Sequence, residues 1–283
     1  TVTHSRFKKL RKHFDRISYE DEDVLIVHGD AVLLIDALPS ESINLAVTSP
    51  PYNIGKEYES VRPLPDYLSW CSEWLEKLPR ILTETGAFWL NLGYLGIRDQ
   101  GKAIPLSYLL WNRVPLYMIQ EVVWNYGAGV AAKNCFSPRN EKFLWYVKDP
   151  EVYMFNLDSV RDPNVKYPKQ KKNGQLKCNP LGKNPTDVWQ IPKVTSGTNR
   201  SSKERTPHPA QFPRALIERI VLACSQPGDV IFDPFIGSGT VAEVAIRTGR
   251  KVIGFEIDDS YIGIIKERVK TLRHKLAEES RQQ

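Results

Sequence analysis

The sequence predicts an α/β protein built on a doubly wound, mostly parallel β-sheet. Segments with helical spacing of apolar residues alternate along the chain with short, continuously apolar runs, and such runs are typical of parallel strands covered on both faces. A glycine-containing turn follows one of these runs directly, as in the strand-to-helix connections of this fold class. With 41% hydrophobic residues in 283, the chain can bury the core of one large domain that carries an insertion.

The first half of the chain supplies most of the predicted strands. Residues 1–20 are expected to form a basic N-terminal helix or arm, whose order the sequence leaves open. Beyond it, strands are expected at residues 23–29, 43–47, 87–92, 121–124 and 143–147, and helices at 31–38, 67–82 and 105–114. Trp70 and Trp74 of the second helix are expected in the core.

The composition changes after Lys148. Between Pro150 and Thr206, eleven basic residues oppose five acidic ones, so this stretch carries the whole net charge of +6. Seven prolines occur between positions 150 and 207, and no periodicity is sustained there. An irregular segment of this length indicates a functional insertion or partial disorder. On charge alone, a solvated lysine-rich loop and a phosphate-contacting surface both remain open.

Regular structure is expected to resume in the last quarter of the chain. Helices are predicted at residues 212–224, 240–248 and 261–276, and strands at 229–233 and 251–257. Pro213 begins the first of these helices and Gly249 ends the second.

Cysteine usage and hydropathy argue against several classes of protein. The four cysteines, at positions 71, 135, 178 and 224, form no CxxC pair, so neither a zinc ribbon nor a disulfide framework is expected. The sequence contains neither an apolar run of 18 residues nor a signal-peptide pattern. We therefore expect a cytoplasmic protein without a membrane span or a metal site.

The tetrapeptide Ser49-Pro50-Pro51-Tyr52 follows an apolar strand directly. Two consecutive prolines cannot continue a sheet, so the chain must leave it in a stiff turn with free carbonyl groups. The turn presents a hydroxyl, carbonyl oxygens and an aromatic ring together. These groups can accept hydrogen bonds from an exocyclic amino group and stack on the heterocycle that carries it.

A second loop, Asp233-Pro-Phe-Ile-Gly-Ser-Gly-Thr240, follows the strand at 229–233. Its glycines allow a ligand to approach the backbone, and Glu256 ends the next strand, where a nucleotide-binding fold places its ribose acceptor. A glycine turn alone would equally suit helix packing, and the spacing would suit NAD. However, the GxGxxG pattern is incomplete, and Glu243 puts negative charge where a pyrophosphate would bind, which favours a cofactor without phosphate.

Together with Gly29-Asp30 and His208-Pro-Ala-Gln-Phe-Pro213, these loops resemble the motifs of beta-group, S-adenosylmethionine-dependent DNA amino-methyltransferases of restriction-modification systems, the N4-cytosine and N6-adenine family. The resemblance runs from about Val27 to Arg268 and includes the motif order, in which the SPPY loop precedes the glycine turn. It implies a Rossmann-like methyltransferase sheet with a catalytic half at 21–148, a target-recognition region at 149–206 and a cofactor-binding half at 207–283.

The resemblance also implies the cofactor and the roles of the motif residues. S-adenosylmethionine, without a metal, would be bound by Asp30, Asp233, Phe235, Gly237, Gly239, Thr240 and Glu256. In the SPPY loop, Ser49 Oγ and the Pro50 carbonyl would accept hydrogen bonds from the amino group of the target base, and Pro51 would complete the stiff turn. Tyr52 would stack on this base, flipped out of double-stranded DNA. His208 is expected to be structural. Phe212 stands where the family often has lysine, which weakens a side-chain contact to the cofactor carboxylate.

The DNA contacts and the target base are less well defined by the sequence. Candidate DNA-binding residues in the basic region are Lys169, Lys171, Lys172, Trp189 and Arg200. In the family that the chain resembles, serine at the position of Ser49 is associated more with N4-cytosine enzymes and aspartate more with N6-adenine enzymes, so N4-cytosine is expected and N6-adenine remains the alternative. An idle DNA-binding module and an RNA or protein methyltransferase also remain open. A cognate restriction endonuclease is a possible genetic partner, and the protein is expected to be a monomer or homodimer.

Overall fold

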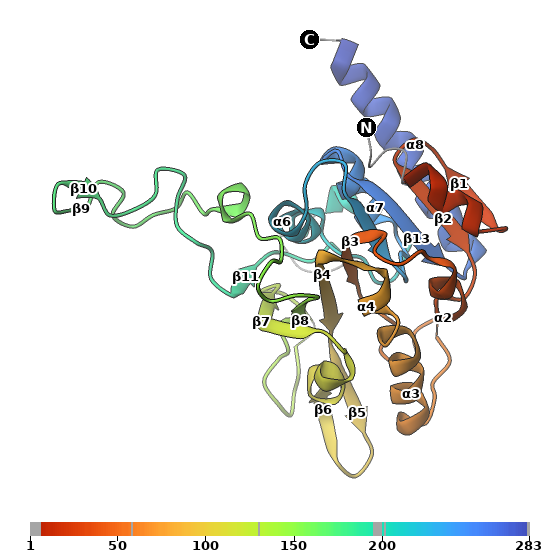
Figure 1. The fold of residues 1–283 in the computed structure, drawn as a ribbon. Helices are drawn as coiled ribbons and strands as arrows, with labels where there is room; N and C mark the ends of the chain where they lie inside the picture. The colour runs from red at the N-terminus through yellow and green to blue at the C-terminus, as the bar shows by residue number, and fades with distance from the viewer. Residues whose placement is uncertain (1–6, 58, 130, 195–199, 201, 282–283) are drawn as a thin grey trace.

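A nine-stranded sheet forms the centre of the protein in the computed structural model (Figure 1), which describes every residue except 1–6, 58, 130, 195–199, 201 and 282–283. The strand order is β1-β2-β13-β12-β3-β4-β8-β7-β11. In that order the strands are Ile17–Glu20, Val24–His28, Lys251–Glu256, Val230–Asp233, Ile43–Thr48, Leu82–Leu92, Asn140–Val147, Tyr117–Asn125 and Val188–Gln190.

The sheet is mostly parallel, as the sequence predicts. Parallel pairing joins β2 to β13, β13 to β12, β12 to β3, β3 to β4, and β11 to β7, whereas β1, β8 and β7 add antiparallel pairs. The chain winds outward from β3 to β4 in one direction and from β12 to β13 in the other. This is the topological switch point of a doubly wound sheet, where ligands bind beyond the carboxyl ends of the strands.

Two hydrophobic clusters cover the two faces of the sheet. Alternate residues of β2 belong to different clusters, Leu25 and Val27 to one and Ile26 to the other, because successive side chains of a strand point to opposite faces. The first face is covered by α2 (Ala31–Leu34), α3 (Leu64–Leu75), α4 (Leu78–Ile81) and α5 (Leu106–Leu110). The second is covered by α6 (Arg214–Cys224), α7 (Thr240–Arg247) and α8 (Asp259–Arg281).

Much of the predicted N-terminal arm is part of the folded domain. Residues 1–6 lie outside the described part of the chain, but Phe7, Leu10 and Phe14 are buried in the first cluster. β1 then pairs antiparallel with β2 at the edge of the sheet. These three apolar side chains anchor the basic segment to the folded domain, and residues 7–10 are helical.

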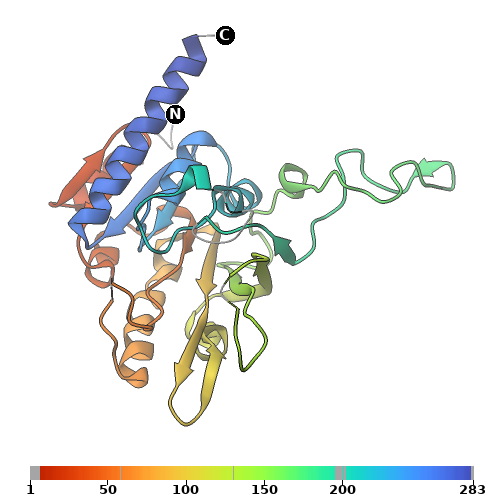
Figure 2. The same cartoon turned by 180° about the vertical axis from the view of Figure 1, so that it is seen from behind.

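Two hairpins extend from the sheet. β5 (Tyr94–Ile97) and β6 (Gly101–Pro105), which the sequence does not predict, follow β4. In the basic region, residues 163–182 form an extended segment, the basic arm, and β9 (Lys171–Lys172) pairs with β10 (Gln175–Leu176) at its tip. The arm stands well away from the sheet in both views (Figures 1 and 2). No helix in the described residues is long and apolar enough to span a membrane.

Candidate functional site

The SPPY loop and the glycine turn begin at the ends of neighbouring parallel strands, β3 and β12. A hydrogen bond joins the two ends: Thr48 Oγ1, the last residue of β3, donates to Asp233 Oδ1 at 2.6 Å. The same carboxylate oxygen accepts from the backbone N–H of Phe235 at 3.0 Å. The sheet thus brings together two motifs that are about 180 residues apart in the sequence.

Asp233 is a buried carboxyl group at this junction, with 2% of its surface exposed. Burial raises its pKa to about 7, since a charged carboxylate loses its hydration there, and the charge of Glu256 acts in the same direction. The hydrogen bonds from Thr48 and Phe235 oppose the shift. The site therefore contains a carboxyl group that titrates near neutral pH.

The glycine turn packs too closely for any larger residue at position 237. Gly237 has a φ of +47°, and a Cβ there would lie 2.9 Å from His208 Nε2. The His208 ring in turn lies against Tyr261, with the ring centroids 4.2 Å apart, and burial lowers the pKa of His208. A neutral, packed imidazole agrees with the structural role expected from the sequence.

Glu256 organises the neighbouring strand end. Its Oε2 accepts from the N–H of Gly237 at 3.0 Å, and its Oε1 accepts from the N–H groups of Ile257 and Asp258, both at 2.9 Å. The backbone carbonyl of Glu256 accepts from the N–H of Gly29 at 2.9 Å. Burial raises the pKa of Glu256. Asp30, which follows Gly29, is exposed. Its Oδ1 accepts from the N–H of Val32 at 2.8 Å and so caps the N-terminus of α2.

Three strand ends therefore contribute the predicted cofactor residues to one edge of the sheet: β2 with Asp30, β12 with Asp233, and β13 with Glu256. Two further predicted residues use their side chains elsewhere. The Phe235 ring packs against Trp74 and Trp70, with centroids 5.2 and 5.7 Å apart, and Thr240 Oγ1 donates to the Phe212 carbonyl at 3.2 Å. These two side chains hold the turn in place.

In the SPPY loop, the hydroxyl groups of Ser49 and Tyr52 form a chain. Ser49 Oγ donates to the Tyr52 hydroxyl at 2.8 Å, and that hydroxyl lies 2.7 Å from Asn91 Oδ1 and 3.2 Å from Glu141 Oε2. Tyr67 donates to the Pro51 carbonyl at 2.8 Å, which braces the turn. The Tyr52 ring lies against the backbone at Gly93, where a Cβ would approach Cε2 to 2.8 Å.

Asn91 and Glu141 are polar residues at the site that the sequence reasoning missed. Asn91 interrupts the apolar run of β4, and only 1% of its surface is exposed. Glu141 lies in β8 just before the run predicted as a strand. A polar residue within an apolar run can be recognised from the sequence. Its hydrogen-bond partner cannot, because the partner depends on which strands are neighbours in the sheet.

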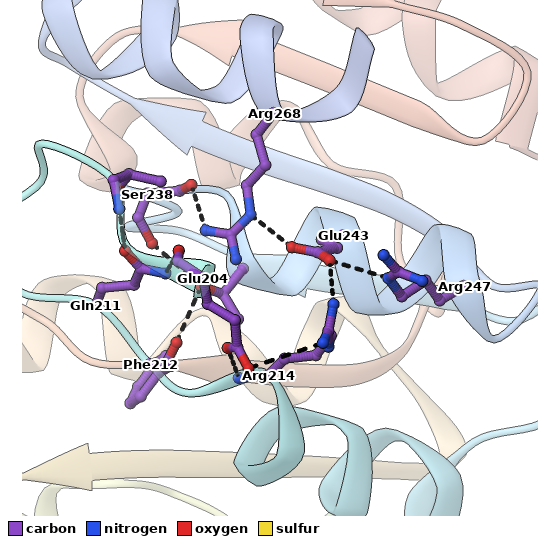
Figure 3. A network of polar contacts seen from close by, with 10 residues as sticks. Glu204, Gln211, Phe212, Arg214, Ser238, Glu243, Arg247 and Arg268 are labelled. Atoms are coloured by element: carbon purple, nitrogen blue, oxygen red, sulfur yellow. Dashed lines mark hydrogen bonds and ion pairs between the residues drawn. The ribbon is translucent and has the colours of Figure 1, made fainter. Parts of the chain in front are cut away.

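A network of arginines surrounds Glu243 behind the glycine turn (Figure 3). Glu243 Oε1 accepts from Arg214 at 2.8 Å and Arg247 at 2.9 Å, and Oε2 accepts from Arg268 at 2.8 Å. Burial opposes ionisation, but the arginines prevail and hold the pKa of Glu243 at about 2. Arg268 also donates to the Ser238 carbonyl at 3.0 Å. Because three cations compensate Glu243, its charge gives no argument against a phosphate at the turn, which corrects the inference drawn from the sequence.

The candidate DNA-binding residues fall into two groups. Lys169, Lys171, Lys172 and Arg200 are exposed. Trp189 is only 8% exposed and stacks on Trp89, with the centroids 5.7 Å apart and Arg219 over its ring. Its ring is buried because β11 joins the sheet beside β7, and this packing gives Trp189 a place in the core; its contact with DNA stays a prediction. Within the described residues, no group of three or more His, Cys, Asp or Glu could hold a metal ion.

Comparisons with known proteins agree with this architecture. A family model for DNA methylase, N6_N4_Mtase, matches residues 43–267. The Type II methyltransferase M.ScaI of Streptomyces caespitosus is 60% identical over 92% of this chain and 86% of its own length. The DNA adenine methyltransferase YhdJ of Escherichia coli (strain K12) is 34% identical over 95% of this chain and 90% of its own length.

Two solved structures share the fold. The cytosine-N4-specific PvuII DNA methyltransferase gives a TM-score of 0.70 at 20% identity and covers 92% of this chain and 95% of its own. The complex of M1.HpyAVI with SAM gives a TM-score of 0.56 at 21% identity and covers 87% of this chain and 98% of its own.

Proposed function

The chain belongs to the DNA methylase family of N6 and N4 methyltransferases, and from that premise we propose that it transfers a methyl group from S-adenosylmethionine to the N4 amino group of a cytosine in double-stranded DNA. The observation that carries the proposal is the hydrogen bond between Thr48 and Asp233. It joins an amine-accepting loop to a glycine turn of the kind that binds a cofactor, as a direct transfer between two bound molecules requires.

The residues at the edge of the sheet fit S-adenosylmethionine. The glycine turn packs closely against the His208 ring at Gly237, and Asp30, Asp233 and Glu256 lie at or just after the ends of neighbouring parallel strands. When bound, the cofactor supplies an electrophilic methyl group on a cationic sulfonium. We assign Glu256 and Asp30 to the ribose and adenosine end and the backbone of the turn from Asp233 to Thr240 to the methionine part. This set of acceptors suits a cationic ligand better than an anionic one.

The SPPY loop activates the target amine. An exocyclic amino group conjugated with its ring is a weak nucleophile because its lone pair is delocalised. Ser49 Oγ and the Pro50 carbonyl accept its two N–H groups, which draws the nitrogen towards tetrahedral geometry and stabilises the positive charge that develops there. Tyr52 stacks on the base. Because this loop cannot reach a base inside a duplex, the target nucleotide must be flipped out.

The choice of cytosine rests on Ser49 and on the fold likeness to a methyltransferase described as cytosine-N4-specific. N6-adenine is the second candidate, because a relative covering 95% of this chain is named a DNA adenine methyltransferase. The exposed lysines of the arm support DNA as the substrate, since phosphate contacts supply most of the affinity for DNA. The Type II name of M.ScaI supports a restriction-modification role with a cognate endonuclease.

The test is to incubate the protein with mixed-sequence duplex DNA and methyl-labelled S-adenosylmethionine, digest the DNA, and identify the labelled nucleoside by mass spectrometry. N4-methylcytosine is the expected product. N6-methyladenine would keep the mechanism and overturn the choice of base. Cofactor binding without a labelled nucleoside, over a broad set of sequences, would point to an RNA or protein substrate or to an idle DNA-binding module.

Replacing Tyr52 in the same assay tests the assigned catalytic loop. Tyr52→Ala removes the stacking ring and the hydroxyl that accepts from Ser49, so methyl transfer should be lost while S-adenosylmethionine still binds. Isothermal titration calorimetry measures the binding. Full methyl transfer by the variant would contradict the assigned roles.

A further inference from the structure

Two residues outside the SPPY loop converge on its tyrosine. Asn91 and Glu141 come from β4 and β8, which are antiparallel neighbours in the sheet. Asn91 Oδ1 lies 2.7 Å and Glu141 Oε2 lies 3.2 Å from the Tyr52 hydroxyl. Asn91 is 1% exposed, and the Glu141 side chain is 17% exposed. Buried polar groups of this kind are kept in fixed hydrogen-bonding geometry because an unpaired one is costly.

The direction of the hydrogen bonds follows from the chemistry of the two groups. Asn91 Nδ2 donates to the Lys142 carbonyl at 3.2 Å, which fixes the amide so that its oxygen faces Tyr52. A carboxylate such as Glu141 only accepts. The phenolic hydrogen of Tyr52 is therefore directed towards these two acceptors, and the phenolic oxygen accepts from Ser49 at 2.8 Å.

We propose that Asn91 and Glu141 are positioning residues that set the direction of the Ser49–Tyr52 chain, so that Ser49 Oγ meets the target amine as an acceptor. This proposal rests on the proposed function. A serine hydroxyl can donate or accept, and a donor facing the N–H groups of the amine would repel them. Since the Ser49 hydrogen is committed to Tyr52, the Ser49 lone pairs are the groups left for the substrate, and the chain is set before the substrate arrives.

Lys193 holds Glu141 in the required orientation. Its Nζ lies 3.5 Å from Glu141 Oε1 and 3.7 Å from the centroid of the Tyr126 ring. The hydroxyls of Tyr94 and Tyr126 also interact with Glu141, and burial raises the pKa of both, so they stay neutral at physiological pH. Lys193 is a cation paired with this carboxylate. Lys193 itself follows β11, in the region assigned to target recognition.

Glu141→Gln tests the proposal with almost no change of shape. Lys193 repels an amide N–H₂ group and attracts its oxygen, so the new amide turns its nitrogen, a donor, towards Tyr52. That donor competes with Ser49 for the phenolic oxygen. We expect the single-turnover rate of methyl transfer to fall about tenfold, with the KM for DNA and the Kd for S-adenosylmethionine unchanged. The matched control is Glu121→Gln, another glutamate paired with a lysine, on the neighbouring strand β7.

Two double variants separate this role from a structural one. In Glu141→Gln/Lys193→Met the amide is free to turn its oxygen to Tyr52, so part of the lost rate should return. In a Tyr52→Phe background the hydroxyl is absent, and Glu141→Gln should then cost little further rate. Rates are compared at saturating DNA, because Lys193 lies in the recognition region.

The outcomes distinguish this inference from the proposed function. Absence of methyl transfer by the unaltered protein on any DNA would refute the proposed function, whatever the variants do. If the unaltered protein is active, an unchanged rate in Glu141→Gln would overturn the positioning role. Additive losses in Glu141→Gln and Tyr52→Phe would overturn it as well, because they would show that Glu141 does not act through the Tyr52 hydroxyl.

Discussion

At the scale of single residues, Gly237 is the point at which the glycine turn packs against the ring of His208. Gly237→Ala should weaken S-adenosylmethionine binding at least tenfold, because the new Cβ would lie 2.9 Å from His208 Nε2 and a φ of +47° is strained for alanine. Gly228→Ala is the control, since φ there is +90° and a Cβ would meet nothing within 4 Å. Calorimetric titration measures the binding. Equal affinity in both variants would mean that close packing at 237 does not shape the cofactor site.

Asp233 makes the stability of the cofactor-free protein depend on pH. Its pKa rises from 3.8 to about 7 in the folded state, so between these values the native protein holds a proton that the unfolded chain has lost. Stability contributed by this group is therefore lost as pH rises through that window. Asp233→Asn cannot ionise, yet its amide oxygen can still accept from Thr48. Its gain in Tm over the unaltered protein should grow from pH 5 to pH 8, and a gain independent of pH would contradict the buried, titrating carboxyl group.

Some site residues could be predicted from the sequence because their signal is local. Asp233 and Glu256 each end an apolar strand, so strand and turn patterns identify them without a partner. The contacts of Tyr52 with Asn91 and Glu141 depend on β4 lying beside β8, which is decided by the whole sheet. The burial of Trp189 depends on the whole sheet in the same way, because its ring is covered by Trp89 and its strand pairs with β7.

At the scale of elements, Glu243 ties three helices together: α6 through Arg214, α7 through Arg247, and α8 through Arg268. Glu243→Gln removes the charge that compensates all three arginines and should destabilise the protein by about 3 kcal/mol. Chemical denaturation at neutral pH measures the loss. Glu267→Gln on the exposed side of α8 is the control and should change little.

Glu243 should also make the stability of the protein depend on pH in the acid range. Its pKa is held below the ordinary value of 4.5, at about 2, so the stability it contributes is present at neutral pH and is lost as pH falls through this range. The difference in unfolding free energy between Glu243→Gln and the unaltered protein should therefore shrink from pH 6 to pH 3. A difference that stays constant over this range would show that the ionised network does not stabilise the folded state.

Elements with continuous apolar runs are predictable, whereas those defined by their partners are not. The runs at β2, β3 and β12 have an apolar interior of their own and are found close to the expected bounds. β1 has a half-buried, mixed sequence, and β5 and β6 are short, mostly half-buried strands that each contain a glycine. All three form strands because a neighbouring chain segment supplies their hydrogen bonds, which a local pattern does not record.

At the scale of the whole molecule, the site and the basic arm are spatially separate. The candidate site is built from strand ends of the central sheet, whereas β9 and β10 lie at the far end of the arm (Figures 1 and 2). The arm is closed at its base by paired backbone hydrogen bonds between Asp162 and Lys183, both at 2.9 Å. Five lysines and no acidic residue lie between these two positions: Lys166, Lys169, Lys171, Lys172 and Lys177.

This separation predicts that the arm can be removed without damage to the fold or to cofactor binding. Replacing residues 163–182 by Gly-Ser should leave Tm and S-adenosylmethionine affinity unchanged, because Asp162 and Lys183 form an antiparallel bridge whose two ends a two-residue turn can connect. DNA affinity should fall, and the slope of log K against log salt should become shallower by up to about 4.5, since each of the five lysines can make one phosphate contact and each contact contributes about 0.9. Changing the five lysines to glutamine in the intact arm should reproduce the shallower slope. An unchanged salt slope in both variants would mean that DNA is bound through other surfaces and that the arm takes no part in DNA recognition.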